Sequence, residues 1–269
     1  MQRALAVICA LHAGCGRFGF EERREGSGTD GGVDATDAAP ADAFVCVPAG
    51  HDEDADGVDD ACDVCPHLVG AQADADGDRV GDACDPEPMN PRQRIVVFDP
   101  FESLLPAWTA FGGAIVQGGK LRIGVANGAR YVTRPYTVGT DLLVVGGTTG
   151  NAGAANRVVA ITLASSSLAR FYCEMFDDTA ASALKFTYTF DNVAYTIADQ
   201  DPAAVQMTNG AGRFSMATAG TTATCQSSWH GEALTASAAI PAITVDQLLL
   251  YAENIDVSLD YFVQIHTDD

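Results

Sequence analysis

The chain has 269 residues and a formal net charge of −21 at pH 7. This length allows one sizeable domain with smaller attachments. The charge argues against nucleic acid as a partner, because phosphate backbones are bound through Lys and Arg. Residues 50 to 88 contain thirteen acidic side chains and a single basic one, Arg79. The acidity is therefore a property of one segment and not of the whole surface.

The first residues have the pattern of an export signal. A short positive start, MQR, precedes the apolar run ALAVICAL and small residues that end at a cysteine. This pattern resembles a bacterial lipoprotein signal through Ala13, Gly14 and Cys15, whereas His12 stands where that family prefers Leu. The resemblance implies a signal peptide over 1–14, lipidation of Cys15, and a lipid anchor at the outer membrane or cell surface. The alternatives are an ordinary secretory signal, which gives a secreted or periplasmic protein, or a misassigned start codon.

Residues 15 to 44 are rich in Gly, Ala and Asp and have no apolar period, which predicts a flexible tether. No later apolar run reaches the roughly 18 residues needed to span a bilayer. Two of the eight cysteines lie in the first fifteen residues, so six remain after the predicted leader. An even number suits three disulfides in an exported protein.

Two stretches of twelve residues within the acidic segment share one pattern. DEDADGVDDACD (52–63) and DADGDRVGDACD (74–85) both have aspartate at places one, three, five, nine and twelve, valine at seven and cysteine at eleven. This is the ligand spacing of a calcium loop, in which the seventh residue offers its carbonyl oxygen. The predicted ligands are Asp52, Asp54, Asp56, Val58, Asp60 and Asp63 in the first loop, and Asp74, Asp76, Asp78, Val80, Asp82 and Asp85 in the second.

Calcium is favoured because it accepts about 6–8 oxygen ligands, whereas magnesium needs stricter geometry. Zinc is disfavoured because the nearby donors are oxygens. The sixth place needs a sharp turn, which Gly57 supplies in the first loop, while Arg79 stands there in the second. The alternative is an acidic linker without structure.

No amphipathic helix flanks either loop, so the pair is not an EF-hand. The run DDACDVCPHLVGAQADADGDRVGDACD instead resembles the thrombospondin type 3 repeat over about residues 46 to 88. The matching residues are Asp63, Cys65, Pro66 and Gln72, and the departures are Val64, His67 and Ala71. The resemblance implies irregular loops around calcium in a cassette at 45–90, with sequential disulfides Cys46–Cys62 and Cys65–Cys84.

From residue 94 to 269 the sequence consists of short runs with a period of two, separated by Gly, Asn, Asp or Ser. The run LKFTYTF places Leu184, Phe186, Tyr188 and Phe190 on one face. The run VSLDYFVQIH predicts one face for Val257, Leu259, Tyr261, Val263 and Ile265. Many short strands without a helical stripe predict an antiparallel β-sandwich.

The two ends of this region refine the prediction. FDPFESLLPAWTAFGGAIVQGGKLRI (98–123) and the closing IDVSLDYFVQIH resemble a concanavalin A-like, laminin-G-type jelly roll. That resemblance implies that the first and last strands lie together in one sheet. An unrelated sandwich, such as an immunoglobulin-like one, is the alternative. Cys173 and Cys225 are interpreted as a cross-strand disulfide, with simple burial as the alternative.

The sequence does not predict a catalytic residue. Some glycosidases of this fold carry Glu-x-Asp-x-x-Glu on one strand, and in CEMFDD the spacing of Glu174, Asp177 and Asp178 differs, which favours a solvated strand end. His230 has no partnered Ser and Asp. His51 and His67 flank the acidic loops and are assigned to the surface, with a role as an added metal ligand as the alternative. The aromatic candidates for ligand contact are Trp108, Trp229 and Tyr251, with core packing as the alternative for each.

These observations predict a calcium-binding surface lipoprotein whose sandwich recognises a carbohydrate or a protein and does not act as an enzyme. A glycan-cleaving hydrolase and a structural surface spacer are the alternatives.

Overall fold

The computed structural model describes residues 46–124, 127–152, 156–166, 169–177, 182–190, 193–200, 207, 210–229 and 233–268. The predicted signal peptide, the lipidation site Cys15, the tether, Asp178 and His230 lie outside these ranges. Within them, no helix is long and apolar enough to cross a membrane.

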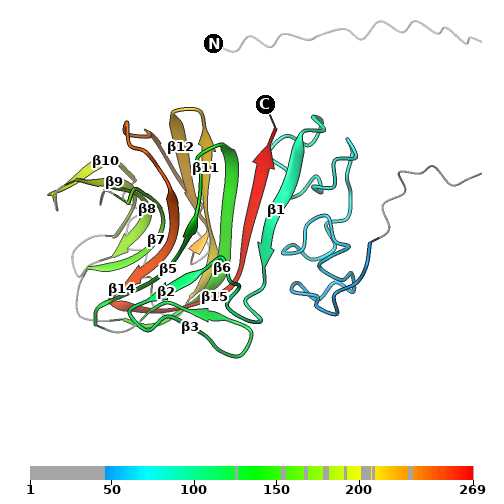
Figure 1. Ribbon diagram of the computed structural model, residues 1–269, viewed down its shortest axis with the longest axis horizontal. Coiled ribbons are helices and arrows are strands. Elements are labelled where there is room, and N and C mark those ends of the chain that lie inside the picture. The colour runs from blue at the N-terminus through cyan, green and yellow to red at the C-terminus, as the bar shows by residue number, and fades with distance from the viewer. Residues whose placement is uncertain are drawn as a thin grey trace, which may run out of the picture. The chain divides into compact units, whose positions relative to one another are not determined.

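The described chain forms two antiparallel sheets packed face to face, which confirms the predicted β-sandwich (Figure 1). Sheet A has the strand order β13-β12-β11-β6-β15-β4-β3, with β1 also paired to β15, and sheet B has the order β10-β9-β8-β7-β14-β5-β2. The strands of sheet A are β1 (Gln93–Asp99), β3 (Ile115–Val116), β4 (Leu121–Arg122), β6 (Thr140–Ala152), β11 (Ala211–Ala219), β12 (Thr222–Ser227), β13 (Leu234–Ala239) and β15 (Ile255–Thr267). Those of sheet B are β2 (Thr109–Phe111), β5 (Ala129–Pro135), β7 (Arg157–Ala164), β8 (Arg170–Asp177), β9 (Ser182–Phe190), β10 (Val193–Gln200) and β14 (Gln247–Glu253).

The first and last strands of the sandwich lie side by side. Strand β1 pairs with β15 so that Gln93 is opposite Thr267 and Asp99 is opposite Phe262. This is the pairing that the jelly-roll resemblance implies.

The core lies between the two sheets and is filled by the inward side chains of each strand. The rings of Phe171 and Phe186 stack with centroids 4.9 Å apart, and the Trp108 ring meets Phe262 edge-on at 5.4 Å. A disulfide joins Cys173 on β8 to Cys225 on β12. Because these strands belong to different sheets, the bond crosses the core. The two cysteines are paired as predicted, and the bond joins the two sheets instead of neighbouring strands of one sheet.

A β-bulge in β15 makes the predicted single face of this strand wrong. Leu259 is opposite Gly147 and Tyr261 is opposite Gly146, so Asp260 is an extra residue without a partner in β6. Val257 and Leu259, before the bulge, face the core. The residues after the bulge that point to the outer face of sheet A are Tyr261, Val263 and Ile265.

The irregular cassette covers this apolar outer face. Its residues Cys65, Val80 and Cys84 are buried in one cluster with the three outward residues of β15 and with Val144 of β6. Burial of apolar surface is the main favourable term in such contacts. The residues from Cys46 onward accordingly form one compact unit.

Two disulfides fasten the cassette internally. They join Cys46 to Cys62 and Cys65 to Cys84, with Cα–Cα distances of 5.2 and 5.9 Å. This is the sequential pairing that the thrombospondin-type resemblance implies. With little regular structure, the cassette depends on these bonds and on its contact with sheet A.

Candidate metal loops and candidate ligand-binding face

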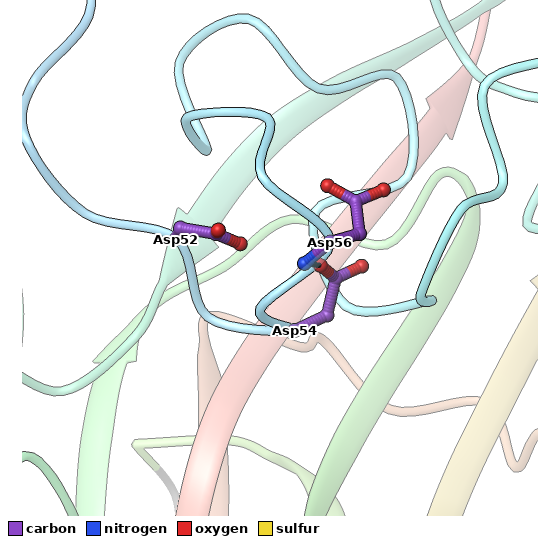
Figure 2. Close-up of side chains that lie close together, drawn as sticks. All are labelled: Asp52, Asp54 and Asp56. Atoms are coloured by element: carbon purple, nitrogen blue, oxygen red, sulfur yellow. Dashed lines mark hydrogen bonds between the residues drawn. The ribbon is translucent and has the colours of Figure 1, made fainter.

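Each acidic loop brings three aspartates together. One carboxylate oxygen from each of Asp52, Asp54 and Asp56 lies within 4.8 Å of the others. Figure 2 shows these three side chains close together in the first loop. Asp74, Asp76 and Asp78 form the equivalent cluster in the second loop. Carboxylates this close repel one another unless a cation lies between them.

Backbone donors shape both loops in the same way. In the first loop, the Gly57 amide donates to Asp52 Oδ2 at 2.9 Å, and the Val58 amide donates to Asp56 Oδ1 at 2.8 Å. In the second loop, the equivalent bonds run from Arg79 to Asp74 at 3.0 Å and from Val80 to Asp78 at 2.9 Å.

The fourth and sixth places of both loops have positive φ. These angles are 61° at Ala55 and 93° at Gly57, and 81° at Gly77 and 76° at Arg79. Each loop therefore has a glycine at one of these two positions and a residue with a side chain at the other. A positive φ is unfavourable for a residue with a side chain. Arg79 adopts the positive φ that the sixth place requires, so the second loop forms the same turn as the first although the glycine is missing.

Several carboxylate oxygens in these loops are buried and have no hydrogen-bond partner among the described residues. They are Oδ2 of Asp54, Asp76 and Asp85. Asp54 and Asp76 occupy the same third place of their loops. Burial raises the pKa of Asp54 and of Asp85, and neighbouring aspartates raise each further. A buried anionic oxygen without a donor is costly, and a calcium ion removes that cost by coordination. The residues therefore fit the metal that the loop pattern predicts.

The ninth-place aspartates of both loops bind other groups and lie outside the two three-aspartate clusters. Asp60 accepts the Glu53 amide at 2.8 Å and contacts His51 Nδ1 at 2.5 Å. Its equivalent, Asp82, accepts the Ala75 amide at 2.8 Å. These ninth-place aspartates brace the backbone of each loop.

The twelfth-place aspartate of the first loop forms hydrogen bonds with the segment between Cys65 and Cys84. Asp63 accepts the Cys65 amide at 2.7 Å and Gln72 Nε2 at 2.6 Å. Asp59, which the repeat pattern leaves out, accepts the amides of Ala49 and Gly50 at 2.9 and 2.6 Å. Valines 58 and 80 occupy the seventh place, and Val80 also contributes its side chain to the buried cluster on sheet A.

His67 is buried against sheet A, so its assignment to the surface is wrong. Its ring centroid lies 5.1 Å from that of Tyr261. Desolvation, together with the charge of Arg213, lowers the His67 pKa to about 4. The imidazole is therefore neutral at physiological pH.

A row of side chains crosses the outer face of sheet B. The strand register places six residues opposite one another from β9 to β2, and these are Lys185, Glu174, Ala160, Tyr251, Tyr131 and Phe111. Ala160 in the middle of the row is 3% exposed, so its neighbours cover it.

The aromatic members of this face are in contact with each other. Phe111 stacks on Tyr131 at 4.8 Å, and Tyr251 lies 6.1 Å from both Tyr131 and Tyr172. The guanidinium of Arg170 lies 5.9 Å from the centroid of Tyr131. Below them, Thr162 on β7 is fully buried, and its Oγ1 has no partner among the described residues.

Only one of the three predicted aromatic contacts belongs to this face. Trp108 and Trp229 are 4% and 2% exposed and fill the core, so core packing explains both. Tyr251 is half-buried on the outer face of sheet B. Tyr131 and Tyr172 were missed, although ARYVTRP and RFYCEMF both place a tyrosine out of phase with the core residues.

The acidic residues of β8 are buried, so the predicted solvated strand end is wrong. Glu174 accepts the Thr187 hydroxyl at 2.7 Å and lies 3.5 Å from Lys185 Nζ. Burial raises the Glu174 pKa, which these two partners lower. Asp177 points to the opposite side of the strand and pairs with Arg157 at 2.8 Å. The two carboxylates therefore cannot act on one ligand.

Comparison with solved structures identifies the fold. A CBM2 module of the evolved Dit of Lactobacillus casei BL23 phage J-1 has a TM-score of 0.50 and 10% identity, covering 66% of this chain and 97% of its own. A seed lectin of Lotus tetragonolobus has a TM-score of 0.50 and 8% identity, covering 64% and 99%. The winged bean acidic lectin, solved with methyl-α-D-galactose, has a TM-score of 0.50 and 8% identity, covering 65% and 98%.

The sandwich thus has the lectin-like jelly-roll architecture that the ends of the sequence predict. No protein-family model matches the chain, and no curated protein sequence matches it.

Proposed function

We propose that this protein binds carbohydrate through the outer face of sheet B and does so at the cell surface. The observation that carries the proposal is the row of Phe111, Tyr131 and Tyr251, with Tyr172 beside it and polar groups at one end. Aromatic rings offer flat apolar area to the C–H face of a sugar, while a few placed polar groups fix its orientation. The lectin architecture supports this reading, and the winged bean lectin was solved with a bound galactoside.

The acidic loops complete the proposal as calcium sites. Asp52, Asp54 and Asp56 would hold one ion, and Asp74, Asp76 and Asp78 a second, with the buried oxygens of Asp54 and Asp76 as ligands. Calcium would supply the positive charge that lets these carboxylates remain ionised in a packed cassette. The cassette could then keep its contact with sheet A.

The proposed cellular location rests on the signal pattern expected over residues 1–14. A lipoprotein signal with lipidation at Cys15 would hold the protein at the outer membrane or cell surface. Three disulfides within the described residues support an oxidising compartment.

A glycan array with the mature protein tests carbohydrate binding, followed by titration of the best ligand. Tyr131→Ala and Tyr251→Ala should each weaken binding about tenfold or more, equivalent to about 1.4 kcal/mol. Val96→Ala, which removes an exposed apolar side chain from β1 in the other sheet, should leave affinity unchanged. Failure of the wild type to bind any glycan would overturn the proposal and favour a protein ligand or a spacer role.

A hydrolase acting on the same face is the alternative, because Glu174 and Glu253 both point outward from sheet B. Burial raises the Glu174 pKa, a property that general acids of glycosidases share. The contacts with Thr187 and Lys185 instead favour a structural role. Incubation with a panel of β-glucans distinguishes the two: sugar released by the wild type and not by Glu174→Gln would establish the hydrolase.

A further inference from the structure

A groove runs along the edge of the cassette, over the outer face of strands β11 and β12. It consists of three cavities of about 340, 370 and 330 Å³. The first and second cavities share His67 and Arg213, and the second and third share Ser215 and Gln226. Each cavity is near the lower end of the volumes of small-molecule sites, about 300–1,000 Å³. Joined in series, they suit an extended ligand.

The floor of the groove consists of short, uncharged polar side chains. Ser215, Gln226 and Thr235 lie opposite one another on β11, β12 and β13. All three line the middle cavity, and they offer hydroxyl and amide groups that both donate and accept. The cassette forms the other wall with Leu68 and Ala83. One apolar wall and one hydrogen-bonding floor match the two kinds of surface on a sugar ring.

The charges along the groove select an anionic group at its centre. Among the described residues, Arg213 is the only charged side chain that lines the middle cavity, in a protein with a net charge of −21. His67 beside it is neutral at physiological pH because burial lowers its pKa to about 4. Arg213 is exposed, and its side chain forms a hydrogen bond with the Tyr261 hydroxyl at the edge of the groove. A guanidinium is well suited to bind a carboxylate through two hydrogen bonds.

The outer cavities restrict how many anionic groups the ligand carries. Glu53, Asp54 and Asp260 line one of them together with Arg213, and Glu87 and Asp141 line the other. A chain with an acid on every unit would be repelled at both ends. A peptide is less suited, because the face of a sheet offers no free backbone groups for strand addition.

We propose that this groove is a second binding site, for a neutral oligosaccharide that carries one uronic acid, with the carboxylate bound by Arg213. The site lies on sheet A and is independent of the proposed carbohydrate face on sheet B.

Calorimetry with two matched probes tests this assignment. One probe is xylotetraose substituted with a single glucuronic acid, and the other is unsubstituted xylotetraose. The wild type should bind the acidic probe at least tenfold more tightly. Arg213→Gln should reduce this preference to about one. Arg122→Gln, a matched change of an arginine on β4 that lines none of the three cavities, should retain it.

Three outcomes with these probes and a peptide would overturn the proposal, and a fourth comes from Tyr251→Ala. The three are the absence of a preference for the acidic probe, an unchanged preference in Arg213→Gln, and binding of an acidic peptide through Arg213 at equal or higher affinity. Tyr251→Ala separates the two sites. Loss of the acidic preference in Tyr251→Ala would place the ligand on sheet B and overturn the groove alone, whereas an unchanged preference supports the groove whether or not sheet B binds glycans.

Discussion

His67 shows how one side chain couples the cassette to the sandwich. Its ring packs on Tyr261, which the bulge in β15 turns to the outer face of sheet A. Its Nδ1 is buried and has no partner among the described residues. Protonation would place a charge in that apolar contact, next to Arg213, so the folded state disfavours it.

Acidification should therefore destabilise the protein through His67. The folded pKa is about 4 against an ordinary value of 6.5, so the unfolded state binds more protons between these values and stability falls as the pH falls. From pH 7 to pH 5 the contribution is about 2 kcal/mol of unfolding free energy. Urea titrations at pH 7 and pH 5 with saturating calcium give the unfolding free energy of each protein. Between these pH values it should fall by about 2 kcal/mol less in His67→Phe than in the wild type. Equal pH dependence of the two proteins would contradict the assignment.

At the scale of the element, β15 shows what the sequence predicts and what it does not. Alternation over VSLDYFVQIH identifies a strand, its length and its apolar positions, because a period of two is a local property. Alternation does not reveal the bulge at Asp260, because Leu259 and Tyr261 remain two positions apart across it. The run Tyr261-Phe262-Val263 is the signal: three consecutive apolar residues require both faces of a strand to be covered.

The acidic loops were predictable for the same reason, because their spacing and their cysteines are local features. The docking of the cassette on sheet A was not. It depends on which side of β15 is apolar after the bulge, and on Cys65 and Val80 meeting residues about 180 positions later in the chain. The row of side chains across the outer face of sheet B likewise forms only when the six strands from β9 to β2 align.

The disulfide between β8 and β12 should contribute more than either cassette bond to the stability of the sandwich. It closes a loop of 52 residues, for which the restriction of the unfolded chain is about 4 kcal/mol. Replacing both Cys173 and Cys225 by alanine should lower the unfolding free energy of the sandwich by about that amount, measured by denaturant titration. The matched removal of Cys46–Cys62, with a separation of 16, should leave the sandwich transition nearly unchanged. A reversed order would contradict this account.

At the scale of the whole molecule, the cassette and the sandwich are one compact unit. The sequence predicts a calcium-binding cassette that precedes the sandwich. In the structure this cassette also covers Val263 and Ile265 on sheet A. The cassette therefore shields the apolar side chains on the outer face of sheet A from water. Metal binding in the loops and order on sheet A should be linked.

Removing calcium should loosen the cassette and leave the sandwich folded. With a chelator, we expect faster proteolysis between residues 50 and 88, stronger binding of a hydrophobic dye, and unchanged far-UV circular dichroism of the strands. Asp54→Asn combined with Asp76→Asn should have the same effect without a chelator and should abolish calcium binding in calorimetry. Asp268→Asn, an acidic change outside the cassette, is the control. Equal cleavage with and without calcium would count against the metal sites.

The two sequential disulfides also determine how the cassette responds to tension. A pull on the chain ahead of Cys46 would pass through the sulfur bridge to Cys62, and then from Cys65 directly to Cys84. The residues between the bridged cysteines carry none of that load, and they include both three-aspartate clusters. A force applied at Cys46 would therefore stretch the segments outside the bridges and leave the two aspartate clusters without load.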